Sequence, residues 1–207
     1  MEKGTKNTER RNSNTDKQKK RHLPRVERRR ERTRKRIMEI GAERFAEESL
    51  SQVKLELIAD EADISRATLY SHFASKEEIL REIIRPVLDE LARNLKDKKA
   101  SNSGQGLENV IEVFIDMWDE HGTALILALR YILHCPGDMS DTVNKINSLT
   151  DSALRPLHND GALRIKIDLA RSMLIQTAIV LLDVLQKESN RTALFRECLR
   201  GLILKKS

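Results

Sequence analysis

The side chains of this 207-residue chain that could bind a polyanion by charge are concentrated at its start. Residues 1–36 carry 16 of the 38 Lys+Arg and only 5 of the 32 Asp+Glu, so the remainder of the chain has a net negative charge. Each Lys or Arg that neutralises a phosphate releases a condensed counterion, and such a segment therefore suits nucleic acid. A solubilising tail, an RNA tether and a nuclear-import signal remain alternatives, because a basic run alone is a weak signal.

No residue pattern in the sequence indicates catalysis or a metal centre. It contains no nucleophile and base at a recognisable spacing, no phosphate-binding glycine loop and no paired-carboxylate motif. Cys135 and Cys198 form no CxxC pair and the five histidines are scattered, so ligand spacing supports no zinc site. We therefore expect a protein that is not an enzyme and that uses no cofactor or metal.

The composition favours an all-helical fold. Glycine and proline together make up 12 of 207 residues, about half their usual share of roughly 12 %. With aromatic residues at only 3 %, strands and tight turns are poorly supported. The longest apolar run, residues 124–129, is far shorter than the roughly 18 residues that span a bilayer. Without an apolar leader at the N-terminus or a disulfide framework, we expect a cytoplasmic protein that does not enter the membrane.

The first half of the chain has the spacing of a helix-turn-helix. Apolar residues predict a helix over about 25–48 and a shorter one over 54–61. Ser65 is a suitable N-cap for a third helix ending near Phe73. Asp63 lies in the intervening turn, where the chain often needs a left-handed residue. Two short helices in this arrangement form the layout of a helix-turn-helix.

A long helix and a linker separate this region from the second half. Ser75 and Glu78 form a predicted capping box for a helix that runs to about Lys96. Residues 97–106, DKKASNSGQG, predict a linker. Beyond it, apolar repeats predict helices over residues 107–121, 123–134, 138–154, 160–186 and 190–204. Pro156 and the Asn-Asp-Gly at 159–161 are expected to interrupt them.

Residues 43–80, ERFAEESLSQVKLELIADEADISRATLYSHFASKEEIL, resemble the DNA-binding domain of the TetR family of bacterial transcriptional regulators. The strongest stretch is ISRATLYSHFASKEEIL, with its T-L-Y-x-H-F core and the S-K-E that follows. The resemblance implies an all-α protein, with an N-terminal three-helix helix-turn-helix domain and a C-terminal helical ligand-binding and dimerisation domain. The expected division is a disordered basic arm (1–24), the helix-turn-helix domain (25–85), a connecting helix and linker (86–106), and the effector-binding and dimerisation domain (107–207).

The resemblance also implies which residues contact DNA. Residues at the major-groove end of the recognition helix are Ser65, Arg66, Ala67 and Thr68. Arg66 is the best candidate base reader, since a guanidinium bonding guanine O6 and N7 together is worth about 1–3 kcal/mol of discrimination. Tyr70, His72 and Lys76 match positions that grip phosphates. Outside this motif, Tyr70 and His72 would be read as ordinary surface residues.

The chain departs from the family pattern where the second helix begins. Val53 and Lys54 replace the usual pair of hydroxyl residues, and neither can accept the hydrogen bonds of a cap. Ser51 or Gln52 could substitute as the cap, and Lys54 becomes a further candidate for phosphate contact.

In relatives with a helix-turn-helix, arginines of an N-terminal extension can enter the adjacent minor groove. The candidates for that contact here are Arg28, Arg29, Arg30, Arg32 and Arg34. We expect the arm to add mainly salt-dependent affinity.

The resemblance implies a dimer formed by a bundle of the last two helices of each subunit. Residues 169–185 are apolar nearly all round, as expected for a helix that packs on its own domain and on a partner. The expected interface residues are Leu174, Leu181, Leu185, Phe195, Leu199 and Leu202. A core helix of a monomer is the alternative.

An effector pocket within the second domain is also implied. Candidate lining residues are Phe114, Trp118, His121, Tyr131, His134 and Gln176. Each could equally belong to plain core or surface, and none indicates a particular effector.

From these features together we expect a homodimeric, sequence-specific DNA-binding regulator in the bacterial cytoplasm, at the nucleoid. Its partners would be double-stranded DNA, a second copy of itself and an unknown small molecule. We expect a repressor that the effector releases from a palindromic operator, as is the habit of the family. The alternative is an architectural or protein-recruiting DNA-binding factor with little or no effector control.

Overall fold

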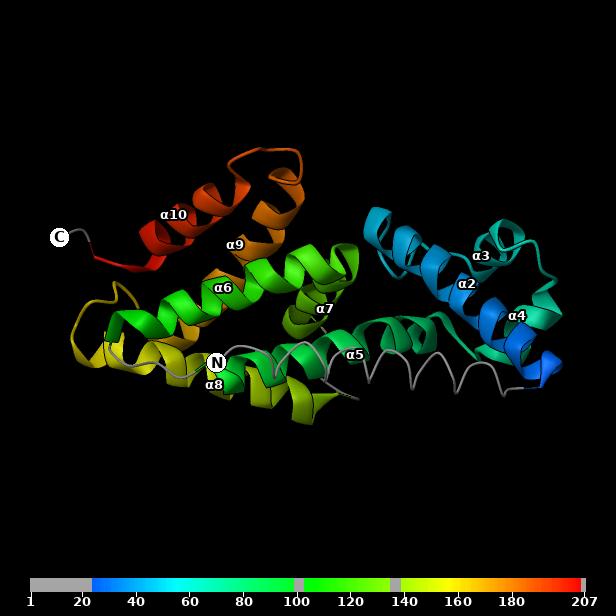
Figure 1. Cartoon of the computed structure of the whole chain (residues 1–207), viewed down its shortest axis with the longest axis horizontal. Coiled ribbons are helices and arrows are strands. Elements are labelled where there is room, and N and C mark those ends of the chain that lie inside the picture. The colour runs from blue at the N-terminus through cyan, green and yellow to red at the C-terminus, as the bar shows by residue number, and fades with distance from the viewer. Residues whose placement is uncertain (1–23, 99–102, 135–138, 206–207) are drawn as a thin grey trace, which may run out of the picture.

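The computed structural model describes residues 24–98, 103–134 and 139–205, and these residues form an all-helical fold (Figure 1). The helices are α2 (Arg25–Glu47), α3 (Leu55–Glu61), α4 (Arg66–His72), α5 (Lys76–Asp97), α6 (Ser103–His121), α7 (Thr123–His134), α8 (Ser140–Asn159), α9 (Ile167–Val184) and α10 (Arg191–Ile203). Within the described ranges the extended structure is limited to an isolated bridge between Leu163 and Leu204. The expected basic arm, residues 1–24, lies outside the described residues except for Pro24.

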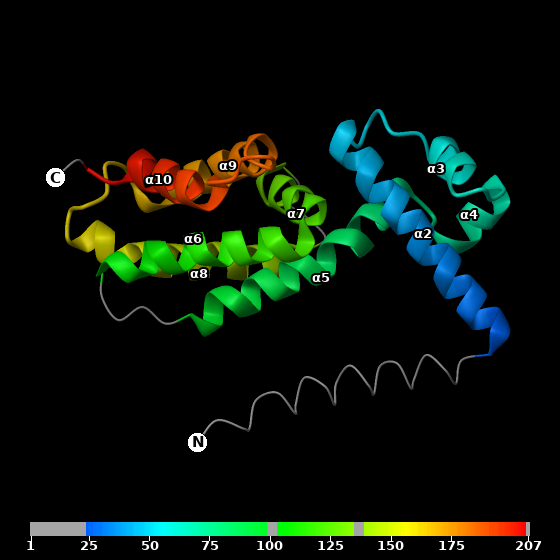
Figure 2. The ribbon, with the colours of Figure 1, turned by 45° about the horizontal axis from the view of Figure 1, so that its top comes forward.

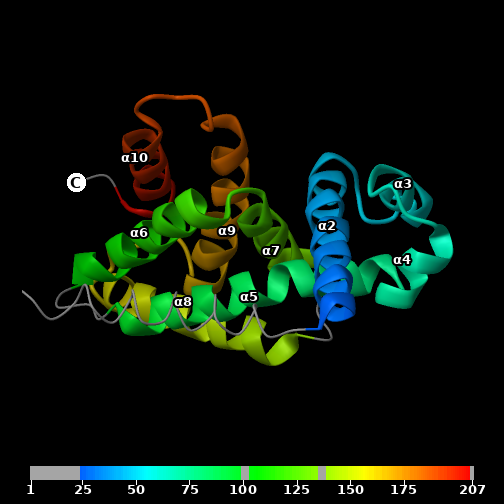
Figure 3. The same cartoon turned by 45° about the vertical axis from the view of Figure 1, so that its right-hand side comes forward.

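The helices form two lobes. We call α2, α3 and α4 the head, and α6 to α10 the body; α5 begins beside the head and runs along the body, as Figures 1 and 2 show. Helix α5 packs on α2 and also on α6, α7 and α8. Figure 3 shows α3 and α4 on the side of α2 that faces away from the body. The two short helices are therefore exposed at one end of the molecule.

The turn between α3 and α4 confirms the predicted helix-turn-helix. Asp63 has a φ of 53°, the left-handed conformation expected at this position. The Ile64 amide donates to the Ala59 carbonyl and the Asp63 amide to the Asp60 carbonyl, each at 3.0–3.1 Å. These two bonds are the pair that closes a Schellman turn, so the end of α3 is satisfied by its own backbone.

Both predicted serine caps are present. The Ser65 hydroxyl accepts from the Thr68 amide at 3.1 Å, and the Ser75 hydroxyl accepts from the Glu78 amide at 3.2 Å. The reciprocal half of the capping box differs, because the Glu78 carboxylate accepts from the Ala74 amide rather than from that of Ser75. The caps fix where α4 and α5 begin, and so fix the short link between them.

The head has a small apolar core that holds the helices at defined crossings. Ile37, Ile40, Phe45, Val53, Ile58, Ala59, Leu69, Phe73 and Ile79 are all buried. A Cβ at Gly41 would stand 2.9 Å from a methyl group of Ile79, so glycine permits the close approach of α2 to α5. Arg34 ties three helices, since it donates to the His72 carbonyl at 2.8 Å, pairs with Glu82 at 3.1 Å and stacks on Phe73.

Three boundaries in the body differ from the sequence expectation. Helix α6 begins at Ser103, inside the predicted linker, and α8 continues through Pro156 to Asn159. Pro156 lies in the last turns of α8, where buried Leu154 and Leu157 on either side anchor the helix. Packing on both flanks offsets the one backbone hydrogen bond that proline removes. The segment 160–165 was expected to be helical but is not, and it contains a turn at Gly161, whose φ is 66°.

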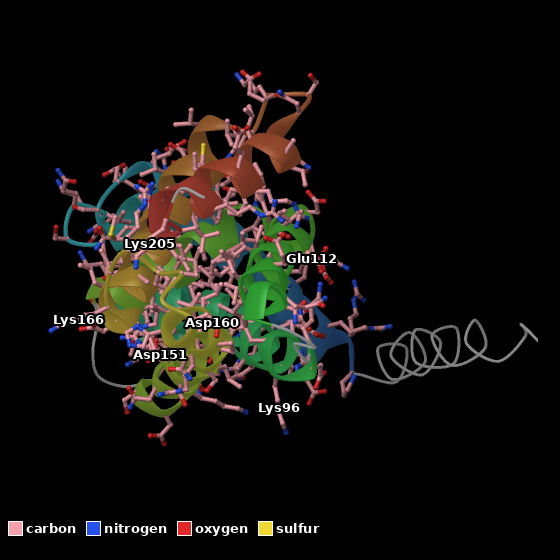
Figure 4. All side chains as sticks on the ribbon, turned by 90° about the vertical axis from the view of Figure 1, so that its left-hand side faces the viewer. Lys96, Glu112, Asp151, Asp160, Lys166 and Lys205 are labelled. Atoms are coloured by element: carbon pink, nitrogen blue, oxygen red, sulfur yellow. The ribbon has the colours of Figure 1, made fainter. Side chains whose placement is uncertain are left out.

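Charge of both signs surrounds the end of the body that is far from the head. Figure 4 looks at this end, where the labelled side chains come from several elements: Lys96, Glu112, Asp151, Asp160, Lys166 and Lys205. No helix among the described residues is long and apolar enough to cross a membrane. The described surface with an excess of arginine is the start of α2, at the other end of the molecule.

Candidate nucleic-acid interface

Helix α4 presents a polar face to solvent and an apolar face to the head core. Leu69 and Phe73 are each about 1 % exposed, whereas Arg66 and Ala67 are exposed and Tyr70 is 52 % exposed. Residues one turn apart, such as Arg66 and Tyr70, share one side of a helix. The structure therefore brings the predicted recognition residues together on one accessible surface.

The first turn of α4 is held rigid by hydroxyl groups. Beside the capping bond, the Ser65 and Thr68 hydroxyls lie 2.8 Å apart, and the Ser71 hydroxyl donates to the Thr68 carbonyl. The Arg66 guanidinium is 3.9 Å from the Glu56 carboxylate and its side chain is 68 % exposed. An exposed ion pair of this kind is worth little, so it leaves Arg66 able to reach a ligand.

His72 lies at the other end of α4 and is only partly accessible. Its Nδ1 is buried without a hydrogen-bond partner among the described residues. Burial lowers the pKa of His72 below its ordinary value of 6.5, and the nearby charges of Arg30 and Arg34 lower that pKa further. The ring is therefore neutral at pH 7, and an added phosphate beside it would favour its protonated form.

Lys54 and Lys76, both predicted to contact phosphate, have different surroundings. Lys54 precedes α3 and is exposed. The Lys76 ammonium donates to the carbonyls of Ser51 and Val53, at 3.0 and 3.2 Å. Sequence reasoning missed this contact, which fixes the segment before α3 and occupies two of the three ammonium donors.

No side chain caps α3, so neither Ser51 nor Gln52 takes the place of the missing hydroxyl cap. The Gln52 side chain accepts from the backbone amide and the hydroxyl of Ser49, and the Ser51 hydroxyl also bonds the Ser49 hydroxyl. These groups stabilise the turn itself. The Leu57 amide donates to the Lys54 carbonyl at 3.1 Å, whereas the amides of Leu55 and Glu56 in the first turn of α3 receive no side-chain cap.

The arginines proposed for the minor groove lie on α2. Arg28, Arg29 and Arg30 are exposed on its first turns. A helix is about 10–12 Å across, whereas the minor groove is about 6 Å wide, so the helical segment that carries these three arginines is too wide to enter that groove. Arg34 is engaged by Glu82 and the His72 carbonyl, and its role is to hold the head together.

Three of the residues expected at the dimer interface lie inside the protomer. Leu174, Phe195 and Leu199 are fully buried, and Phe195 packs on Trp118 with ring centroids 6.0 Å apart. A side chain without exposed surface adds no area to an interface, which corrects these three assignments. Leu181 and Leu202 are partly exposed, and Leu185 is nearly buried. The apolar side chains that α9 exposes are Leu169, Val180 and Val184.

The candidate effector residues do not converge on one cavity. Phe114 and Trp118 are core residues, His121 is 3.1 Å from the Glu90 carboxylate, and Gln176 is exposed on α9. None of Phe114, Trp118, His121 and Gln176 lines the cavity beside Tyr131 or the hollow between α7, α8 and α9, and their place at an effector site stays a prediction. The side chain of His134 lies outside the described residues. Tyr131 lines a cavity between the head and the body.

Comparison with known proteins agrees with this geometry. The profile of the family described as "Bacterial regulatory proteins, tetR family" matches residues 37–83, which span the end of α2 through the first turns of α5. The chain is 30 % identical to the HTH-type transcriptional repressor KstR2 of Rhodococcus jostii (strain RHA1) over 153 residues, 70 % of this chain and 75 % of that protein. It is 25 % identical over 166 residues to the HTH-type transcriptional activator FasR of Mycolicibacterium smegmatis, covering 78 % of this chain and 71 % of the activator.

Solved structures share the fold over most of the chain. The ketosteroid transcriptional regulator KstR2 of Mycobacterium tuberculosis superposes with a TM-score of 0.63 at 23 % identity, covering 84 % of this chain and 95 % of that one. A regulatory protein of the tetR family from Rhodococcus RHA1 gives a TM-score of 0.65 at 14 % identity, covering 84 % and 98 %. The similarity therefore includes the body, whose sequence alone carries no recognisable motif.

Proposed function

Because the chain belongs to the TetR family of bacterial regulatory proteins and is a DNA-binding transcriptional regulator, we propose that it is a homodimeric repressor, which a small-molecule effector releases from a palindromic operator. It acts in the bacterial cytoplasm, at the nucleoid. Arg66 in the first turn of α4 contacts the bases, and Ser65, Ala67 and Thr68 lie beside it at the major groove. Tyr70, His72, Lys54 and the arginines at the start of α2 supply phosphate contacts.

The observation that carries this proposal is the capped, exposed α4. Leu69 and Phe73 anchor one side of the helix in the head core, and the Ser65 cap fixes its first turn. Arg66 then projects from a rigid base with most of its side chain accessible. A guanidinium positioned in this way can bond guanine O6 and N7 together, which is the commonest specific contact in the major groove.

The exposed face of α9 supports the homodimer. Leu169, Gln176, Val180 and Val184 fall along one stripe of the helix, and Val180 and Val184 are 59 % and 68 % exposed. Leu181 on the same helix and Leu202 on α10 are partly exposed and are the further interface residues of this proposal. A two-fold dimer presents two copies of α4, and recognition helices one DNA turn apart, about 34–36 Å, bind half-sites that are near-palindromic.

Selection of bound sequences from a random duplex pool tests the proposal. The purified full chain should recover one palindromic motif, and Arg66→Ala should blur that motif at symmetric positions. Arg155→Ala is the matched control, because Arg155 is an exposed arginine on α8 in the body. A variant lacking residues 1–24 should recover the same motif with a weaker dependence of affinity on salt.

The arginine-rich start of α2 favours one other function. Its exposed side chains are suited to phosphates, which carry no sequence information, so an architectural DNA-binding factor would also use them. If the pool yields no motif and binding depends on salt alone, that function replaces the repressor, and the recognition role of Arg66 is wrong.

A further inference from the structure

A cavity lies where the head meets the body. It has a volume of about 280 Å³ and is lined by residues from the end of α2 and the loop after it, from α5 and from α7: Phe45, Glu48, Ser49, Leu50, Leu80, Leu127, Arg130 and Tyr131. We call this space the junction cavity. None of the residues proposed to contact DNA lines it, so it is a separate site.

The chemistry of the junction cavity suits an apolar ligand. Phe45, Leu80 and Leu127 come from three different helices and form its inner wall, and each is nearly buried. Glu48 and Arg130 both line the space, one negative and one positive. A ligand with a net charge would meet a like charge as well as an opposite one, so an uncharged apolar molecule fits best.

Another hollow in the body has a different character. A space of about 380 Å³ between α7, α8 and α9 is lined by Asn147, Asp168, Arg171 and Ser172 together with apolar residues. Arg171 there is held by Asp151. Removing these polar groups from water for an apolar ligand would cost free energy, which favours the junction cavity.

The position of the junction cavity connects it to the DNA-binding surface. Arg130 of α7 donates to the Ala46 carbonyl in the last turn of α2, at 3.3 Å. Two residues earlier on α2, Arg44 bonds Glu61 at the end of α3. A molecule between α7 and the end of α2 therefore touches a chain of contacts that leads from the body to α3 and α4.

We propose that the junction cavity is the effector site of this protein, and that its ligand is a small, uncharged apolar molecule of about one or two rings. This inference rests on the proposed function for its regulatory role, but not for the binding itself. Binding controls the head only if the ligand prefers one head orientation, because a ligand with equal affinity for both orientations shifts nothing. The occupied state is the one with lower affinity for the operator.

Binding is tested with 1-fluoronaphthalene as probe, by ligand-observed fluorine NMR on the full chain. Leu50→Trp fills the cavity from a half-buried loop position, and Leu127→Phe fills it from α7. Both should weaken probe binding at least tenfold while the helical circular dichroism stays unchanged. Leu133→Trp is the control, since Leu133 lies on the same helix but lines the polar hollow. The site is overturned if both filling variants bind the probe as tightly as wild type does. It is also overturned if the control variant alone loses binding.

The regulatory role is tested by operator affinity with and without the probe. Wild type should lose at least fivefold in affinity for the selected duplex at saturating probe, and Leu50→Trp should lose none. If the probe binds in the cavity but operator affinity does not change, the effector role is wrong although the site exists. If wild type selects no operator, the proposed function fails, and the NMR comparison still decides whether the cavity binds.

Discussion

The two short helices of the head and the longer helices of the body are held in different ways. In the head, α3 and α4 have only seven residues each, and a Schellman turn, two serine caps and the contacts of Arg34 and Lys76 hold them. In the body, helices of 12 to 20 residues pack along broad apolar faces. The short helices of the head are therefore held by contacts of particular residues. The helices of the body are held by the apolar surface that they bury together.

This difference explains what could be predicted from the sequence. Asp63, Ser65 and Ser75 each have a conformational role that their residue type and position indicate, and the structure agrees with all three. The bounds of α2, α3 and α4 consequently fell within one residue of the prediction. A turn or a cap depends on a few neighbouring residues, so local sequence is sufficient to identify it.

The body was predicted only in outline. Residues 169–185 are apolar nearly all round, so their sequence did not indicate which side faces the protomer core and which faces outward. Leu174 proved to be core and Val180 exposed, a distinction that depends on the positions of α7 and α8. The junction cavity was missed for the same reason, since its lining comes from segments up to 86 residues apart, Phe45 and Tyr131.

Loss of a buried ring from the core of the head should change stability most. Phe73→Ala removes a fully buried ring that packs between α2 and α4, and should destabilise the head by about 3–5 kcal/mol. Hydrogen exchange should show α2 to α4 opening while amides of the body remain protected. Phe195→Ala is the counterpart in the body, and it should open α6, α9 and α10 instead. Equal loss of protection throughout the chain in both variants would contradict the division into two lobes.

The next effect is on the dimer. Val180→Glu places a charge at the centre of the exposed stripe of α9, where its desolvation would oppose association. We expect the dimer dissociation constant to rise by roughly 100-fold, about 2.7 kcal/mol, as measured by analytical ultracentrifugation. Leu57→Glu is the control, because Leu57 is an exposed apolar residue of the head. A Val180→Glu protein that stays dimeric would place the interface elsewhere.

A smaller effect is expected from removing one cap. Ser65→Ala takes away the acceptor for the Thr68 amide and should cost about 1 kcal/mol of local stability in α4. Operator affinity should fall by at most roughly fivefold, which is the loss expected if the whole of this local stability is needed for the bound form of α4. Ser71→Ala removes a hydroxyl from the same helix that donates to a carbonyl and caps nothing, so its effect should be smaller. If the two variants lowered operator affinity equally, the Ser65 cap would not be what stabilises α4 for binding.

The smallest effect concerns an acid-sensitive contact in the body. Burial alone would raise the pKa of Glu108, but the hydrogen bonds and charges of Arg200 and Arg196 outweigh it and lower that pKa below the ordinary 4.5. The stabilisation is therefore complete above pH 4.5 and is lost as the pH falls through the lower value of the folded state. Because Arg200 is half exposed, we expect Glu108→Gln to cost only about 1 kcal/mol at pH 7.

Urea unfolding at several pH values checks this contact. The difference between wild type and Glu108→Gln should close as the pH falls below 4.5. Glu197→Gln is the control, because Glu197 is an exposed residue of the same helix as Arg196 and Arg200. A difference that is independent of pH would show that packing, rather than charge, makes the contact.

In the proposed function, α4 reads bases whereas the start of α2 binds phosphates. Affinity for the selected operator and for a scrambled duplex, measured at one salt concentration, separates the two roles. Arg66→Ala should lose about 1–3 kcal/mol on the operator and almost nothing on the scrambled duplex. Simultaneous replacement of Arg28, Arg29 and Arg30 by Ala should lower the affinity for both duplexes by the same factor. If Arg66→Ala lost the same affinity for both duplexes, Arg66 would not read bases.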